Sequence, residues 1–198
     1  MSLLLNGLAA SNGIAIAPAY LLVGSDLPVQ KQHTNDKDHE VTRLHDSFAF
    51  SRQELRRIRD QAHERLGQRA AAVVDTQLAM LGDPALFAMM RQEIMQSGVT
   101  AEWAVKQTAD HYLTIFEKQN DNDYLQARGT AMRDVAKRLL SHLMAVELPD
   151  PQKLDHRAII VAANITPTDT AQFDRRYVAG LVTDTGGRTS HFTIMSRT

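Results

Sequence analysis

The sequence predicts an α/β unit formed by both ends of the chain and interrupted by an inserted all-α helical-bundle domain. Short apolar runs bounded by glycine, asparagine and proline occur at both ends of the chain, and such runs are typical of strands and turns. In the middle, apolar residues recur every three or four positions, which is the period of amphipathic helices. Because these apolar stripes can be buried only against one another, they predict a bundle. We expect residues 1–24 and 148–198 to form the α/β unit and residues 35–145 the helical domain.

Composition places the chain among globular proteins, since 43% of its 198 residues are hydrophobic and 23% are charged. A formal net charge of −1 gives no long-range positive field, which argues against a nucleic-acid partner. The absence of cysteine excludes disulfides, thiol nucleophiles and thiolate metal sites, and it fits a reducing, cytoplasmic compartment. No apolar run approaches the roughly 18 residues of a membrane-spanning helix, so we expect no membrane insertion.

The first elements expected are strands in two apolar segments near the N-terminus, Leu3–Leu5 and Ile14–Val23, which glycines and a proline separate. A polar connector from Asp26 to Asn35 follows. After it the pattern changes to that of helices, because apolar residues from Val41 onward are spaced by threes and fours.

The middle of the chain is expected to form consecutive helices with short connections. Gly67 ends the first of them, and Asp83 before Pro84 supplies an N-cap followed by proline at the first helical position. Gly98 closes that helix, and Thr100 caps the next. The expected helices begin near residues 41, 69, 84, 101 and 124.

Beyond residue 148 the pattern returns to that of an α/β unit. The run Ala158–Ala162 is short enough for a buried strand, Thr166 begins a helix, and Tyr177–Val182 is a second strand. A further helix opens at His191 and meets the end of the sequence at Thr198 after one or two turns. Such a helix cannot bury an apolar face, so we expect a truncated chain.

The loop after the second of these strands carries the strongest candidate for chemistry. Its paired glycines, Gly186–Gly187, let the backbone approach a ligand closely. Thr189 or Ser190 can cap the following helix, which places His191 beside free N–H groups that favour anions. A neutral imidazole has one unprotonated nitrogen near pH 7 and can attack phosphorus, while Arg188 helps to hold the phosphoryl group. The alternative is an ordinary glycine turn with a surface histidine.

This loop lies in the run TDTGGRTSHFTIMSR, which resembles the active-site signature of Enzyme I. Enzyme I is the phosphoenolpyruvate-protein phosphotransferase that starts the bacterial sugar phosphotransferase system. Four more motifs match the family in order and spacing: NGLAASNGIAIAPA, AMLGDPAL, YLQARGTAMRDVAKRLL and ITPTDTAQF. The resemblance covers essentially the whole chain. It implies a swivelling phosphohistidine domain formed by both chain ends, incomplete at its C-terminus, and an inserted helical domain that docks the phosphocarrier protein HPr.

The resemblance also implies roles for individual residues of the α/β unit. His191 matches the histidine that is phosphorylated on Nε2, and Thr170 matches a threonine whose hydroxyl bonds the other ring nitrogen. That bond would fix the ring and leave Nε2 free to attack, as partners of metal-bound histidines do. The residues that match the phosphate side of the loop are Gly186, Gly187, Arg188, Thr189 and Ser190.

In the helical domain the family usually has a histidine where this chain has Gln77, which puts part of the carrier interface in question. Docking would use apolar anchors in a groove between helices, with charged residues around the rim. The candidate contacts close to Gln77 are Leu78, Met80, Leu81 and Leu86, with Arg128 at the rim.

Family members bind phosphoenolpyruvate and magnesium in a C-terminal barrel that also carries dimerisation, and nothing in this sequence resembles that barrel. We therefore expect no cofactor or metal site in these residues, a monomer for this fragment and a homodimer for the full-length enzyme. Two other functions remain open. One is the phosphohistidine domain of a pyruvate phosphate dikinase or phosphoenolpyruvate synthase, against which the AMRDVAKRLL segment argues. The other is a helical adaptor without chemistry of its own.

Overall fold

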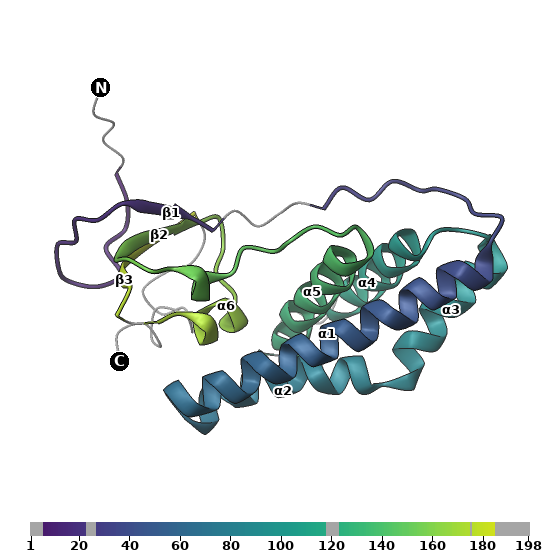
Figure 1. Ribbon diagram of the computed structural model, residues 1–198, viewed down its shortest axis with the longest axis horizontal. Helices are drawn as coiled ribbons and strands as arrows, with labels where there is room; N and C mark the ends of the chain where they lie inside the picture. The colour runs from purple at the N-terminus through teal and green to yellow at the C-terminus, as the bar shows by residue number, and fades with distance from the viewer. Residues whose placement is uncertain (1–5, 23–26, 118–122, 175, 185–198) are drawn as a thin grey trace. The chain divides into compact units, whose positions relative to one another are not determined.

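The computed structural model describes residues 6–22, 27–117, 123–174 and 176–184 (Figure 1). The chain divides into two compact units. The α/β unit comprises Met1–Gly24 and Pro149–Thr198, and the helical unit comprises Ser25–Leu148. In the described residues, one unit contains a small parallel sheet and the other is built from helices, so the predicted fold class is confirmed. Among the described helices, none is long and apolar enough to cross a membrane.

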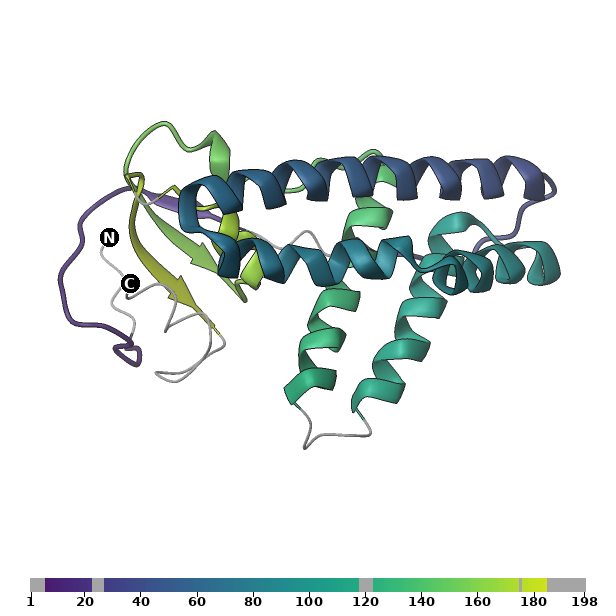
Figure 2. The same ribbon diagram turned by 90° about the horizontal axis from the view of Figure 1, so that it is seen from below.

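The described part of the helical unit forms helix hairpins joined by short connections. Helices α1 and α2 lie side by side, and α4 and α5 form a second pair that crosses them (Figure 2). The sequence predicted all of these helices, with ends that differ by a few residues. Their bounds are α1 Lys37–Leu66, α2 Gln68–Gly82, α3 Pro84–Ser97, α4 Ala101–Glu117 and α5 Asp123–Leu143.

Local capping explains where α3 begins and ends. The Asp83 carboxylate accepts a hydrogen bond from the Ala85 N–H at 2.8 Å, and Pro84 is the first helical residue. At the other end Gly98 adopts a left-handed φ of 61°, and its N–H donates to the Ile94 carbonyl. Both ends agree with the sequence prediction, because each depends on residues next to one another in the chain.

The core of the helical unit is built from the apolar stripes of its helices. Leu44, Leu55 and Ile58 of α1 are completely buried, as is Leu139 of α5. Phe48 is also buried and meets a ring of α3 edge to face, at 5.3 Å between centroids. These side chains belong to one continuous cluster that draws on all five helices.

The expected polar connector at residues 26–35 is fastened to the helical unit where the structure describes it. Leu27 and Val29 pack against the helical core. The Thr34 N–H donates to the Gly98 carbonyl at 2.9 Å, within an isolated antiparallel bridge. The sequence pattern missed this attachment because two isolated apolar residues do not form a stripe.

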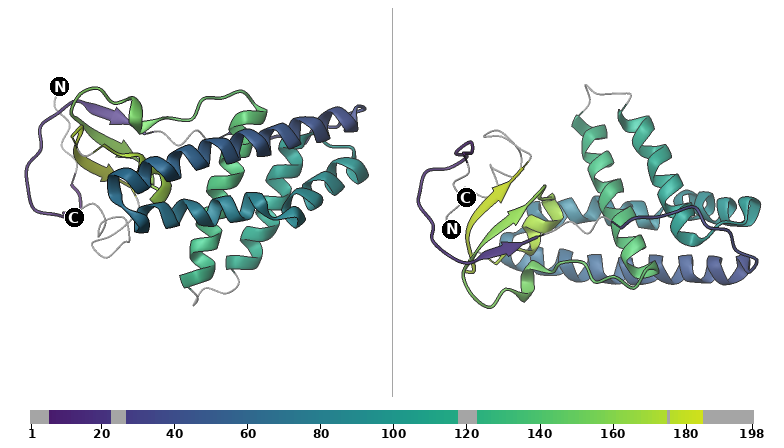
Figure 3. Two further views of the ribbon diagram at one scale, coloured as in Figure 1. Left: turned by 60° about the horizontal axis from the view of Figure 1, so that its bottom comes forward. Right: turned by 90° about the horizontal axis from the view of Figure 1, so that it is seen from above.

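The α/β unit contains a parallel sheet in the order β1-β2-β3, with β1 Ala19–Leu21, β2 Ala158–Ala162 and β3 Val178–Thr183 (Figure 3). Helix α6, Pro167–Gln172, connects β2 to β3, and a short 3₁₀ turn at Pro151–Lys153 precedes β2. Parallel neighbours require a crossover connection. The whole helical unit is the crossover between β1 and β2.

The N-terminal strand is much shorter than the segment Ile14–Val23 predicted. Pro18 lacks an N–H group, and its carbonyl accepts from the Ile159 N–H at 2.8 Å just before β1 begins. Ile14 and Ile16 lie outside the strand and are each 95% exposed. The other expected strand, Leu3–Leu5, lies outside the described residues.

Candidate functional site

Two adjacent strands of the α/β unit end at the same edge of the sheet. Ala162 at the end of β2 is paired with Thr183 at the end of β3. The Asp184 N–H donates to the Ala162 carbonyl at 3.3 Å, which holds the chain beside β2 as it leaves β3. Ligands of open parallel sheets bind at such carboxyl edges. Helix α6 and the segment that begins at residue 185 therefore both start from the edge where a ligand is expected.

A capping box fixes the first turn of α6. The Thr166 hydroxyl accepts from the Asp169 N–H at 3.1 Å, and the Asp169 carboxylate accepts from the Thr166 N–H at 2.9 Å. These reciprocal bonds give partners to two backbone N–H groups in the first turn, where an α-helix leaves such groups without intrahelical acceptors. The predicted helix start at Thr166 is confirmed.

Thr170 lies on α6 with 9% of its surface exposed. Its hydroxyl donates to the Thr166 carbonyl at 3.1 Å. A hydroxyl has one proton to donate and two lone pairs to accept with. With that proton used inside α6, the Thr170 oxygen can only accept from a further partner.

The predicted partner of Thr170 is not among the described residues. His191 and the predicted phosphate loop all lie in the segment 185–198, outside the part of the chain that the structure describes. The loop residues concerned are Gly186, Gly187, Arg188, Thr189 and Ser190. Their pairing with α6 stays a prediction.

The structure separates the predicted docking residues into buried and accessible ones. Gln77, Leu81 and Leu86 are only 2%, 1% and 2% exposed, which leaves almost no surface for a partner. The Gln77 amide donates to the Asp134 carboxylate at 2.9 Å and so links α2 to α5. These three side chains therefore lie inside the helical unit, and any part they have in docking stays a prediction.

The remaining docking candidates have accessible side chains. Leu78 and Met80 are half-buried on α2, and Arg128 is exposed on α5. The Arg128 guanidinium lies over the ring of Tyr124, 5.1 Å from its centroid, and Tyr124 is 62% exposed. Tyr124 is not among the docking residues that the sequence predicts, although its spacing of four residues from Arg128 on a helix indicates that the two side chains are neighbours. Exposed tyrosine beside arginine is typical of the residues that dominate protein interfaces.

A shallow depression of about 480 Å³ lies on the α1–α2 hairpin. Its residues are mostly charged or polar, and Arg59 is paired with Asp60 at 2.7 Å. The lining consists of Arg59, Asp60, His63, Glu64, Gln68, Ala71 and Asp75. Neither here nor elsewhere in the described residues do three histidine, aspartate or glutamate side chains form a group that could hold a metal ion.

A group of charged and polar side chains joins α1 to α5. The Arg138 guanidinium, 9% exposed, is ion-paired with Glu54, and His142 Nε2 lies 3.2 Å from the same carboxylate. Burial opposes ionisation of Glu54, but the charges and hydrogen bonds of Arg138 and His142 outweigh it and lower the pKa of Glu54. Glu54 is therefore ionised at neutral pH, and the pair ties the two helices together.

The chain matches two family models over most of its length. Residues 6–128 match the N-terminal domain of PEP-utilising enzymes, and residues 154–198 match the mobile domain of PEP-utilising enzymes. A phosphoenolpyruvate-protein phosphotransferase of Enterococcus faecalis is 49% identical over 197 residues, which are 100% of this chain and 34% of the relative. The chain thus spans about a third of the length of the curated relatives it matches.

Solved structures show the same similarity in three dimensions. A solution structure of Enzyme I is 30% identical, with a TM-score of 0.85 over 98% of this chain and 79% of the other. The N-terminal domain of a nitrogen Enzyme 1 is 29% identical, with a TM-score of 0.67 over 96% of this chain and 78% of the other.

Proposed function

Because the chain belongs to the PEP-utilising enzyme family, and within it to Enzyme I, we propose that it carries the phosphohistidine of a phosphoenolpyruvate-protein phosphotransferase. His191 accepts a phosphoryl group on Nε2 and passes it to a histidine of HPr. The observation that carries this proposal is the position of Thr170, buried on a helix at the sheet edge where the segment toward residue 191 begins.

The hydrogen-bond state of Thr170 gives the proposal a chemical basis. Its hydroxyl proton is used in the bond to the Thr166 carbonyl, so its oxygen accepts from Nδ1–H of His191. That bond selects the tautomer with its lone pair on Nε2. In transfer from phosphorylated HPr, Nε2 then forms a bond to phosphorus as the bond from phosphorus to the HPr histidine nitrogen breaks. The bonds formed and broken are both phosphoramidates, so the transfer runs in either direction.

The loop of residues 186–190 binds the phosphoryl oxygens in this proposal. Gly186 and Gly187 let backbone N–H groups approach, and Thr189 and Ser190 add donors at a helix start. The Arg188 guanidinium offsets the negative charge of the group in transit.

The helical unit supplies the docking surface for HPr. Leu78 and Met80 are its apolar anchors on α2, and Tyr124 with Arg128 forms its polar rim on α5. A groove between helices that presents apolar anchors inside a charged rim suits a partner helix. Rim charges act mainly on association, so added salt is expected to weaken docking by slowing it.

The proposal assigns phosphoenolpyruvate, magnesium and dimerisation to the part of its longer relatives that this sequence does not cover. The described residues do not fit magnesium, since none of their carboxylates form a suitable group, and no step here passes through a metal. The site of action proposed is the cytoplasm. Relatives named phosphoenolpyruvate-protein phosphotransferase support this function over a dikinase domain or an inert adaptor.

The test is labelling of the purified 198-residue chain by two donors. Phosphorylated HPr is expected to label the chain, and phosphoenolpyruvate with magnesium is not. The label is read by mass spectrometry at neutral or basic pH, because phosphohistidine is acid-labile. Failure of phosphorylated HPr to label the chain would contradict the proposal.

A further inference from the structure

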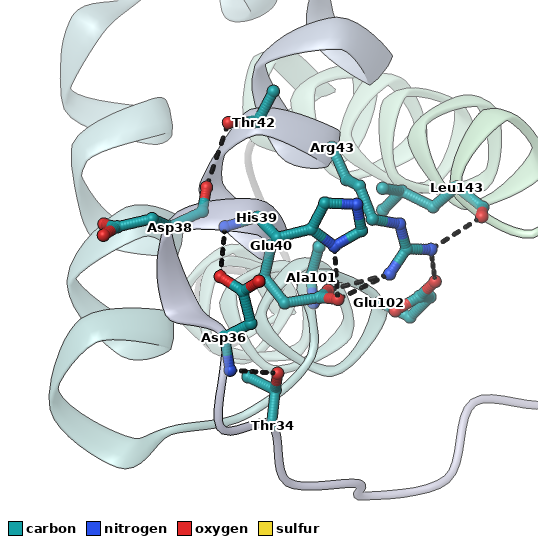
Figure 4. A network of polar contacts seen from close by, with 10 residues as sticks. All are labelled: Thr34, Asp36, Asp38, His39, Glu40, Thr42, Arg43, Ala101, Glu102 and Leu143. Carbon is teal, nitrogen blue, oxygen red and sulfur yellow. Dashed lines mark hydrogen bonds and ion pairs between the residues drawn. The ribbon is translucent and has the colours of Figure 1, made fainter.

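A network of charged side chains joins the ends of three helices in the helical unit (Figure 4). From α1, the Arg43 guanidinium donates to both Glu40 oxygens, at 2.9 and 2.8 Å. Its second nitrogen donates to Glu102 at the start of α4 and, at 2.9 Å, to the Leu143 carbonyl at the end of α5. The Glu40 carboxylate also accepts from the Ala101 N–H at 2.8 Å.

Each charge in this network faces a helix end of the opposite sign. The Glu40 carboxylate meets the positive N-terminus of α4, and the Arg43 guanidinium meets the negative C-terminus of α5. Burial acts to lower the pKa of Arg43, but hydrogen bonds and charges from Glu102 and Glu40 outweigh it and raise that pKa. The guanidinium therefore stays charged, and its fixed fork holds three separate groups at once.

The same helix ends are where the two connections to the α/β unit meet the helical unit. The first connection runs into α1, and the Thr100 N–H beside α4 donates to its Gln32 carbonyl at 3.1 Å. The second leaves α5, where the Val146 N–H folds back to the Ser141 carbonyl at 2.9 Å. By joining α1, α4 and α5, Arg43 fixes both attachment points relative to each other.

We propose that Arg43 is a positioning residue for phosphotransfer, because it fixes relative to each other the two points where the connections to the α/β unit leave the helical unit, and so restrains the motion between docked HPr and the acceptor histidine. The inference rests on the proposed function, in which HPr docks on the helical unit while the acceptor belongs to the α/β unit. The rate of such a transfer depends on the effective concentration set by the connecting segments. Docking itself depends on other residues, on α2 and at the start of α5.

Arg138 provides a matched control. Like Arg43 it is paired with a glutamate of α1, and it is more deeply buried, but its carboxylate partner, Glu54, lies in the middle of that helix. Lysine retains the charge at either position and lacks the planar fork that reaches several partners. Arg43→Lys and Arg138→Lys therefore make the same chemical change. Only Arg43→Lys is expected to loosen the points where the connections attach to the helical unit.

The experiment compares single-turnover transfer from phosphorylated HPr, HPr affinity and amide hydrogen exchange in the unmodified chain and both variants. For Arg43→Lys we expect an unchanged HPr affinity. Transfer should be slowed by roughly tenfold, which is within the range for small misplacements of reacting groups. Amide hydrogen exchange should become faster at Thr34, Thr100 and Val146. For Arg138→Lys we expect transfer within about twofold of the unmodified rate, since no connection is disturbed. Should Arg43→Lys not fold, Glu102→Gln replaces it, with a smaller loss of transfer expected.

The outcomes separate this inference from the proposed function. Equal transfer rates in Arg43→Lys and the unmodified chain would overturn the positioning role while leaving the function intact. Equal slowing by both variants would also overturn it, because the effect would then follow from stability alone. Absence of labelling in the unmodified chain would defeat the proposed function, and the positioning role would fall with it.

Discussion

The two units of this chain differ in how completely they bury their apolar side chains. In the helical unit, large residues such as Leu55 and Ile94 are fully buried in a cluster that all five helices share. In the described part of the α/β unit, Ile14 is 95% exposed, Leu21 62% and Val182 53%. Among the described residues, the helical unit thus has a large continuous core, whereas the α/β unit has a smaller one around the sheet and several exposed apolar side chains.

This difference matches the division of work that we propose. Docking needs a rigid surface, which a continuous core provides, while the phosphoryl group is held by loops at a sheet edge. Segments with few buried apolar contacts open most easily. We expect the α/β unit to unfold at a lower temperature than the helical unit, with loss of exchange protection in β1–β3 before α1–α5.

The largest expected effect is the loss of phosphorylation in His191→Ala. The variant lacks the only nitrogen nucleophile that the proposal assigns to the transfer, so label from phosphorylated HPr should disappear. A loop substitution usually changes stability by no more than about 0.5 kcal/mol, so both units should unfold as before. Label that persists in the variant would move the chemistry to another residue.

Paired core substitutions test the difference in packing. Leu139→Ala removes a completely buried side chain of the helical unit and should cost about 2–5 kcal/mol of unfolding free energy. Val182→Ala removes a side chain that is 53% exposed on β3 and should cost no more than about 0.5 kcal/mol. Denaturant unfolding followed by circular dichroism measures both. Similar costs would show that the two units are packed alike.

The Glu54 ion pair makes the helical unit sensitive to acid. The pKa of Glu54 is lowered from its usual 4.5, so its contribution is complete above that pH and is lost as the pH falls through the lower folded value. Glu54→Gln should cost about 1–3 kcal/mol at pH 7, as expected for hydrogen bonds to charged groups. Melting curves from pH 7 to 3 should show the two proteins converging only below pH 4.5. A difference in melting temperature between the two proteins that stays constant down to pH 3 would show that ionisation of Glu54 does not contribute to stability.

Thr170→Val is expected to have a small effect on phosphotransfer and a smaller one on folding. Valine keeps the shape of threonine and removes the oxygen that the proposal pairs with Nδ1 of His191. Loss of one hydrogen bond amounts to about 1 kcal/mol, or roughly a fivefold slower transfer. Single-turnover labelling and thermal melting together measure the two effects. A variant that melts earlier yet transfers at the normal rate would make Thr170 purely structural.

Features that depend on neighbouring residues in the sequence were predicted better than contacts between residues far apart in the sequence. The cap at Asp83, the stop at Gly98 and the helix start at Thr166 each depend on neighbours in sequence, and each was predicted. The Arg43–Glu102 pair joins residues 59 positions apart, so no pattern in either helix indicates it. The Arg43–Glu40 pair, in contrast, joins residues three positions apart on one helix, a spacing that can be read from the sequence.

Burial was the main property of the proposed docking residues that the sequence did not reveal. Leu78 and Leu81 lie one turn apart on α2, yet Leu78 is half-buried and Leu81 is 1% exposed. Which of them reaches the surface depends on how α1, α3 and α5 pack against α2, and periodicity within α2 does not contain that information. Arg128 is exposed, and its predicted place at the rim stays a prediction.

The central claim is that HPr docks on the helical unit while the α/β unit carries the chemistry. A titration of the isotope-labelled chain with unphosphorylated HPr, followed through backbone amide shifts, tests it most directly. The account predicts shifts concentrated around Leu78, Met80, Tyr124 and Arg128, with saturation at one HPr per chain. Shifts confined to residues 150–198 would contradict it.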